Sequence, residues 1–224
     1  MDMKKKKIII LSVVGGVILS LSLSLIIPFA IIGINTNNIK NDYHYLRDDI
    51  KYKDKVEITD LELVTQHVSC GYATIEMIST YYGHKVSEDD LDNKNSSIST
   101  SSSKGFLNEI NESITNKAFV METYLKNDEM LIHIYNSLHN NNPIAIEWAA
   151  KYEGEWTLHF SIVSGLDIIN NNVTIYNPYG YIENINIEEF VNRTTFEAYD
   201  NMPLFLNFGF AFGAFHKNTI FYAQ

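Results

Sequence analysis

The sequence contains a single cysteine among its 224 residues, so an intramolecular disulfide is excluded. Positive charge is also short, because 17 lysines and arginines stand against 27 aspartates and glutamates. No basic stripe is present, so nucleic-acid binding is not expected. The sequence also lacks an H-E-x-x-H motif, a cysteine pair, a phosphate loop and a dinucleotide fingerprint, so we expect no metal and no cofactor. With 46% hydrophobic residues, the chain can fold around a core by burial alone.

Charge is absent from residues 8–34, a run longer than the roughly 20 apolar residues that a membrane-crossing helix needs. A cleaved signal peptide has a shorter apolar region and a small-residue cleavage site, and no such site follows here. Lys4–Lys7 precede the run and mark its cytoplasmic side. We therefore expect a cytoplasmic basic segment (1–7), a single-pass signal anchor in the cell membrane (8–34), a stalk or lead-in (35–59) and one extracytoplasmic domain (60–224).

Hydrophobic periodicity predicts helices in the first part of that domain and strands in the second. The expected helices lie at 70–82, 87–91, 106–114, 129–139 (capped by Asn127 or Asp128) and 187–193, and the expected strands at 144–149, 158–166, 173–177 and 219–223. Gly83 stands where a glycine would end the first helix. Helices followed by an antiparallel sheet indicate an α+β fold.

Two segments between and after these elements have distinctive compositions. Residues 95–105 form a serine-rich loop, which we expect to line part of a cleft. The aromatic segment 208–215, FGFAFGAF, is too short to cross a membrane. Core packing is its expected use, with a membrane-facing or partner-binding surface as the alternative.

The single cysteine, Cys70, stands at the predicted start of the first helix, in the stretch QHVSCGYATIEMISTYYG. A thiol attacks as its thiolate, and a helix N-terminus or a nearby imidazolium lowers the thiol pKa from about 8.5 to roughly 3.5–7.5. Free cysteine is also among the most buried residue types. Position alone therefore leaves two interpretations open, a nucleophile or a small apolar core residue.

Three motifs in a fixed order resemble one enzyme family. The stretch from Gln66 through SCGYATIEMISTYYG to SEDDL, and later HFSIVSGLDIINNNVTIYNPYG, are similar to the papain-like cysteine peptidases that process double-glycine leaders of bacteriocins, and to their stand-alone relatives. The resemblance covers about residues 60–190. It implies a papain-like α+β fold, with N-terminal helices packed on a C-terminal antiparallel sheet.

The same resemblance implies a role for each matching residue. Cys70 would be the nucleophile, and His159 the base that later protonates the leaving amine. Asn177, which stands where the closest relatives more often carry Asp, would hold the imidazole in its working tautomer. Gln66, four residues before the cysteine, would offer its side-chain amide to the developing oxyanion together with the Cys70 backbone N–H.

The simplest hairpin between the strands at 158–166 and 173–177 does not place His159 opposite Asn177. With a tight turn at residues 170–172, His159 would face residues near Ile182 instead. A longer loop or a bend at Gly165 is needed to join them, and Asp167 is the reserve candidate for orienting the histidine.

We therefore expect a membrane-anchored cysteine peptidase that hydrolyses an extracytoplasmic peptide or protein through an acyl-enzyme. Leader processing itself is not expected, because it takes place in the cytoplasm and no transporter follows the domain. Two alternatives remain open: a transpeptidase or acyltransferase on the same fold, and a non-catalytic peptide-binding surface module.

Overall fold

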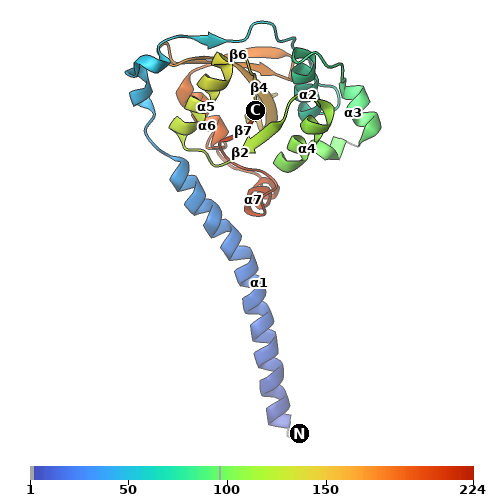
Figure 1. Ribbon diagram of the computed structural model, residues 1–224. Helices are drawn as coiled ribbons and strands as arrows, with labels where there is room; N and C mark the ends of the chain where they lie inside the picture. The colour runs from blue at the N-terminus through green and yellow to red at the C-terminus, as the bar shows by residue number, and fades with distance from the viewer. Residues whose placement is uncertain (1–2, 96) are drawn as a thin grey trace.

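The computed structural model describes residues 3–95 and 97–224. A long N-terminal helix leads into a domain in which helices and one sheet pack together (Figure 1). The elements run in the order α1 (Met3–Ile39), η1 (His44–Arg47), η2 (Ile50–Tyr52), β1 (Val56–Glu57), α2 (Cys70–Tyr81), α3 (Glu88–Lys94), η3 (Ser97–Thr100), α4 (Ser103–Ser113), β2 (Phe119–Glu122), α5 (Asn127–His139), β3 (Ile144–Tyr152), β4 (Glu155–Asp167), β5 (Asn172–Asn177), β6 (Tyr181–Ile185), α6 (Ile187–Thr194), α7 (Leu204–Ala211) and β7 (Thr219–Ala223).

The sheet is antiparallel at every pairing, with the strand order β2-β7-β3-β4-β5-β6 and β1 attached to the end of β4. β4 is its longest strand, at 13 residues, and pairs with β3, β5 and β1. α2 and α5 pack against this strand, and α6 packs against β3 and β5. The predicted α+β fold is thereby confirmed, and β4 forms its centre.

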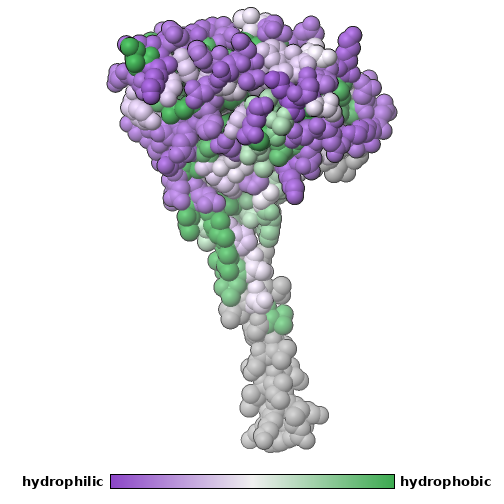
Figure 2. Space-filling model, viewed as in Figure 1, coloured by the Kyte–Doolittle hydropathy of each residue, from purple (hydrophilic) through white to green (hydrophobic). Residues whose placement is uncertain are grey.

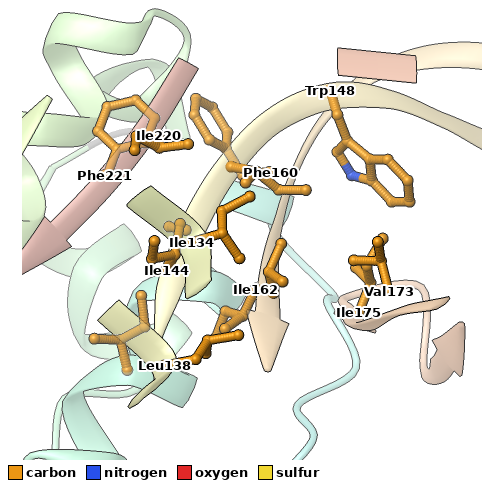
Figure 3. Close-up of a cluster of buried hydrophobic side chains, with 14 of the residues drawn as sticks. Ile134, Leu138, Ile144, Trp148, Phe160, Ile162, Val173, Ile175, Ile220 and Phe221 are labelled. Atoms are coloured by element: carbon orange, nitrogen blue, oxygen red, sulfur yellow. The ribbon is translucent and has the colours of Figure 1, made fainter. Parts of the chain in front are cut away.

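The core lies between this sheet and the helices. Figure 3 shows Phe160 and Ile162 of β4 among side chains from α5, β3, β5 and β7. Phe160 stacks on Phe106 of α4, with 4.3 Å between ring centroids, and both rings are buried. Burying such a side chain contributes roughly 1.5–3 kcal/mol to folding, so this packing fixes the strand that carries His159.

α1 projects from the domain as a stem (Figure 1). Among the described residues it supplies one candidate membrane span, within residues 22–47, on length and apolar composition. Its last turns join the domain: Ile39 is buried and Lys40 forms an ion pair with Glu197. The following segment also packs on the domain, through buried Leu46 and the pairing of β1 with β4.

Most of the elements expected from the sequence are present. The predicted helix at 70–82 is α2, with Gly83 in the left-handed region at φ 81°, and the strand predicted at 219–223 is β7. Two helices begin earlier than expected. α5 starts at Asn127, so the expected cap residues lie within it and Lys126 is the N-cap. α4 starts at Ser103 because the Ser102 side chain caps it, accepting a hydrogen bond from the Gly105 N–H. Residues 103–105 of α4 therefore belong to a helix, where composition predicts the end of the serine-rich loop.

The aromatic segment 208–215 only partly follows the expectation of core packing. Phe210 is buried against Phe196, but Phe208 is 37% exposed and Phe212 is 60% exposed. The segment continues the short helix α7, which places these residues on two different faces. Periodicity did not predict this helix, because apolar residues lie on both of its faces.

Candidate active site

Cys70 is the first residue of α2, at a helix start held by two side chains. Ser69 caps the helix, accepting a hydrogen bond from the Tyr72 N–H at 3.1 Å. Glu88, a fully buried residue of α3, accepts hydrogen bonds from the backbone N–H groups of residues 67, 68 and 69. The turn before the cysteine is therefore fixed from the neighbouring helix.

A cavity of about 510 Å³ lies in front of the thiol. Cys70, Thr100 and Ser101 line one part of it, so the serine-rich loop does contribute to the wall as expected. Gly71 allows this approach, because a Cβ there would lie 2.5 Å from Thr100 side-chain atoms. The rest of the lining is mainly apolar: Trp156, Leu158, Phe160, Tyr199, Phe205, Leu206 and Phe215.

His159 and Asn177 are brought together by an irregularity in the sheet. The register between β4 and β5 shifts between Val163 and Gly165, the bend that the simple hairpin lacked. His159 Nε2 and Asn177 Oδ1 are 2.9 Å apart, and both residues are buried. The imidazole also stacks on Tyr179, with 4.0 Å between ring centroids.

The orientation of the Asn177 amide fixes the tautomer of the imidazole. Its Nδ2 donates to Glu183 Oε1 at 2.6 Å, and a carboxylate can only accept. Its Oδ1 accepts from the Tyr179 N–H at 2.9 Å. Oδ1 therefore faces His159 as an acceptor, so Nε2 carries the proton and Nδ1 is the basic nitrogen.

Arg193 holds Glu183 in turn. The guanidinium donates to Glu183 Oε2 at 2.8 Å and also to Glu189, and it lies over the ring of Trp148. The order of contacts from Arg193 to the imidazole is therefore Arg193, Glu183, Asn177, His159.

The thiol and the imidazole share neighbours. The Phe160 backbone N–H, one residue beyond His159, stabilises the thiolate form of Cys70, as do the N–H groups at the start of α2. Tyr179, which stacks on His159, is also within electrostatic range of the thiol. The two groups therefore belong to one site.

Both groups are neutral in this site. Although Cys70 is partly exposed, burial of the thiol raises its pKa to about 11 and outweighs the lowering by backbone N–H groups. Burial also lowers the pKa of His159 to about 3, opposed by the hydrogen bond to Asn177. The sequence placed Cys70 correctly at a helix N-terminus, but it could not predict that burial would outweigh the effect of the helix.

Gln66 lies beside the same turn. Its backbone N–H donates to the carbonyl of Pro178 at 2.7 Å, one residue after Asn177. Its side-chain Oε1 is buried with no hydrogen-bond partner among the described residues. The four residues singled out from the sequence thus lie around one junction of α2, β4 and the turn after β5.

The other candidates lie elsewhere. Asp167 accepts two hydrogen bonds from Asn170 in the turn after β4, while the side chain that contacts His159 is Asn177. His67 turns toward α3, where its ring contacts Glu88 and Asp89. His133 pairs with Glu122.

Three residues of the site did not emerge from the sequence as functional. Glu183 lies in a polar edge strand that the pattern did not predict, six residues after Asn177. Tyr179 follows Asn177 and Pro178, and its ring stacks on one face of the His159 imidazole. Glu88 lies in a run of acidic residues, in which only the fold distinguishes the one that is buried.

A buried carboxyl group lies within electrostatic range of the cysteine. Glu147 of β3 is fully buried, accepts a 2.6 Å hydrogen bond from Ser103 Oγ, and leaves Oε1 with no partner among the described residues. His216 Nδ1 lies 3.0 Å from the same hydroxyl. Burial raises the pKa of Glu147 to about 8, so this carboxyl is protonated at neutral pH.

The Glu147→Gln variant is expected to gain stability relative to the native chain as pH rises from about 4.5 to about 8. In that range the unfolded native chain releases the Glu147 proton while the folded chain keeps it, so native stability falls by an amount on the order of a few kcal/mol. Glutamine carries no such proton. Urea unfolding of both proteins in detergent across this range measures the difference. The exposed Glu153→Gln variant is the control, and a pH-independent difference for Glu147→Gln would contradict the assignment.

Among the described residues, no group of three or more histidine, cysteine, aspartate or glutamate side chains is arranged to hold a metal ion. The chemistry available at this junction is that of a thiol, an imidazole with an oriented amide, and backbone N–H groups at a helix start. This set suits nucleophilic attack on a carbonyl carbon.

Comparison with known proteins matches a family model and 20 chains of solved structures, one of which is described below. The model of the Peptidase_C39 like family matches residues 58–202. A crystal structure of a double glycine motif protease from an AMS/PCAT transporter, in complex with the leader peptide, is similar over 75% of this chain and 98% of that chain. The identity is 14% and the TM-score 0.46. No curated protein matches the chain.

Proposed function

Because this chain belongs to the Peptidase_C39 like family, a family of cysteine peptidases, we propose that it hydrolyses a peptide bond with Cys70 as the nucleophile and His159 as the base. The observation that carries the assignment of roles is the hydrogen bond from His159 to Asn177, whose amide is held by Glu183. That contact leaves Nδ1 as the nitrogen that accepts the thiol proton.

Attack begins from the neutral pair. As Sγ of Cys70 approaches the carbonyl carbon, the thiol proton passes to Nδ1 of His159, and the carbonyl π electrons move onto oxygen. The Cys70 N–H and the Gln66 side-chain amide donate to that oxyanion. One such donor is worth roughly 2.7–4 kcal/mol of barrier.

Collapse of the tetrahedral adduct gives an acyl-enzyme. The C–N bond breaks, and the imidazolium of His159 delivers its proton to the leaving amine. Water then attacks the thioester while Nδ1 takes one of its protons, which releases the acid and restores the thiol. Asn177 keeps its hydrogen bond to Nε2 throughout, so the ring needs no reorientation between the two halves.

The proposed location follows from α1 and its flanks. The helix is long and apolar, and Lys4–Lys7 precede the apolar run. We take residues 8–34 as the single-pass anchor, 35–59 as the lead-in, and 60–224 as an extracytoplasmic peptidase domain. The substrate is then a peptide or protein outside the cytoplasm.

Product analysis tests this function. The full chain in detergent is incubated with a peptide library, and new termini are identified by mass spectrometry, with and without an added amine. Free carboxyl termini in both cases support a hydrolase. Amides formed in preference to acids would show an acyltransferase, and an unchanged library with a fully alkylatable Cys70 would leave a binding module as the better description.

The Glu183→Gln variant is expected to lower kcat by roughly 10–100-fold with little change in KM, as for other groups that orient a catalytic ligand through a second residue. An uncharged amide can no longer fix which end of Asn177 faces His159, so the wrong rotamer becomes populated. Glu189→Gln is the matched control, because Glu189 also pairs with Arg193 but does not contact Asn177. Equal losses in the two variants would mean that Glu183 acts only by holding Arg193.

A further inference from the structure

α7 carries apolar side chains on both of its faces. Leu206 and Phe210 point into the domain, where they pack with Phe196 and Ala149. The other face leaves four large apolar residues open, a set we call the α7 patch: Leu204 (68% exposed), Phe205 (69%), Phe208 (37%) and Phe212 (60%). Leu204, Phe208 and Phe212 follow one another at four-residue spacing and so share one side of the helix.

No charged residue interrupts this segment. Residues 203–215 contain no lysine, arginine, aspartate or glutamate, and their one strongly polar side chain, Asn207, donates to the backbone carbonyl of Met202. A helix that is apolar all round lies either inside a protein or in a membrane. The α7 patch is not covered by the described part of the domain, so its apolar environment must come from outside the domain.

The contact between α7 and α1 indicates that this apolar environment is the membrane. α7 packs beside α1, and the rings of Phe29 and Phe208 lie 5.5 Å apart in an edge contact. Phe29 lies five residues inside the end of the apolar run at Ile34, about 7.5 Å along the helix. That depth falls within the ~5–10 Å by which interfacial helices enter a bilayer.

The polar boundary lies just beyond this contact. Lys40 is the first charged residue after Ile34, and its ion pair with Glu197 joins the end of α1 to the domain. Figure 2 shows hydrophobic surface where the domain meets α1 and mainly hydrophilic surface over the rest of the domain. The hydrophobic surface is thus continuous with the end of α1 (Figure 2).

We propose that the α7 patch lies in the outer leaflet of the membrane that α1 crosses, so that the domain rests on the bilayer through a second, interfacial contact. This inference rests on the proposed membrane anchor. Phe205 and Leu206 of α7 also line the cavity in front of Cys70. The contact thus places the cleft at the membrane surface, where a peptide lying along the lipid headgroups can enter it.

The test is a depth measurement by electron paramagnetic resonance on the full chain in nanodiscs of phosphatidylcholine and phosphatidylglycerol. In a Cys70→Ala background, single cysteines are introduced as Leu204→Cys or Phe212→Cys and spin-labelled. A label at Ile27→Cys, on the exposed side of α1, is the reference for a position in the proposed anchor. A label at Ile169→Cys, in the exposed turn after β4, is the reference for a position in water. Collision rates with oxygen and with a water-soluble nickel complex give the depth of each label.

We expect oxygen collisions to exceed nickel collisions at positions 27, 204 and 212, and the reverse at position 169. Labels at 204 and 212 that behave like the label at 169, while position 27 is in lipid, would overturn the proposed contact and leave the anchor standing. A label at position 27 that behaves like the one at 169 would instead show that the anchor itself is wrong, and the α7 contact would be rejected with it.

Discussion

The Cys70→Ala variant should lose peptide hydrolysis, with kcat falling by roughly 10⁶-fold, the loss that follows removal of the nucleophile in hydrolases of this general mechanism. Alanine leaves the oxyanion donors and the cavity in place, but it removes the atom that forms the thioester. The only thiol of the chain is gone, so no other cysteine can substitute. Hydrolysis of the library peptide cleaved by the native chain, followed by mass spectrometry, measures the loss.

Cys70→Ser provides the matched variant. The serine hydroxyl keeps nearly the same volume at the start of α2, but it lacks the nucleophilicity of sulfur, so we expect it to be almost as inactive as alanine. Thermal unfolding should show both variants folded, since neither loses a cap or a charged contact. A variant that is folded and still cleaves at more than a hundredth of the native rate would remove Cys70 from the mechanism.

Replacing His159 by glutamine is expected to lower kcat by about 10⁴-fold or more. Glutamine is close to histidine in size and can donate a hydrogen bond to Asn177, but it has no nitrogen basic enough to accept the thiol proton. The residual rate should rise with pH toward the thiol's pKa of about 11, because only spontaneously ionised Cys70 then reacts. The native rate should be flat through neutral pH, since His159, with a pKa of about 3, is already a neutral base.

His84→Gln is the control for this experiment. His84 lies just past the end of α2 that is opposite Cys70, where its backbone N–H donates to the carbonyl of Ser79. We expect native kcat and a native pH profile. If His159→Gln retained a pH-independent rate within tenfold of the native one, general-base catalysis by His159 would be ruled out.

The sequence predicted the elements whose structure depends on the residues within them. The apolar spacing after Cys70 predicted α2, and the β-branched and aromatic runs predicted β3, β4, β5 and β7. Motif order was sufficient to select Gln66, Cys70, His159 and Asn177, which the fold gathers at one junction. Their catalytic roles remain a prediction until the variants are measured.

What the sequence could not predict depends on long-range packing. The shift at Val163 and Gly165 decides whether His159 meets Asn177, and a one-residue change of register is not visible in hydrophobic alternation. Glu183 looks like any solvent-exposed residue of an edge strand until Arg193 and Asn177 enclose it. The reversal of the expected thiol pKa has the same origin, because burial is a property of the folded domain.

The raised pKa of Cys70 has a consequence for oxidation of the thiol. Oxidants convert thiolates to sulfenic acid far faster than they convert neutral thiols. A Cys70 whose pKa is raised to about 11 is almost entirely protonated at neutral pH. We therefore expect the resting thiol to react slowly with hydrogen peroxide near neutral pH, although the cavity that Cys70 lines leaves it accessible.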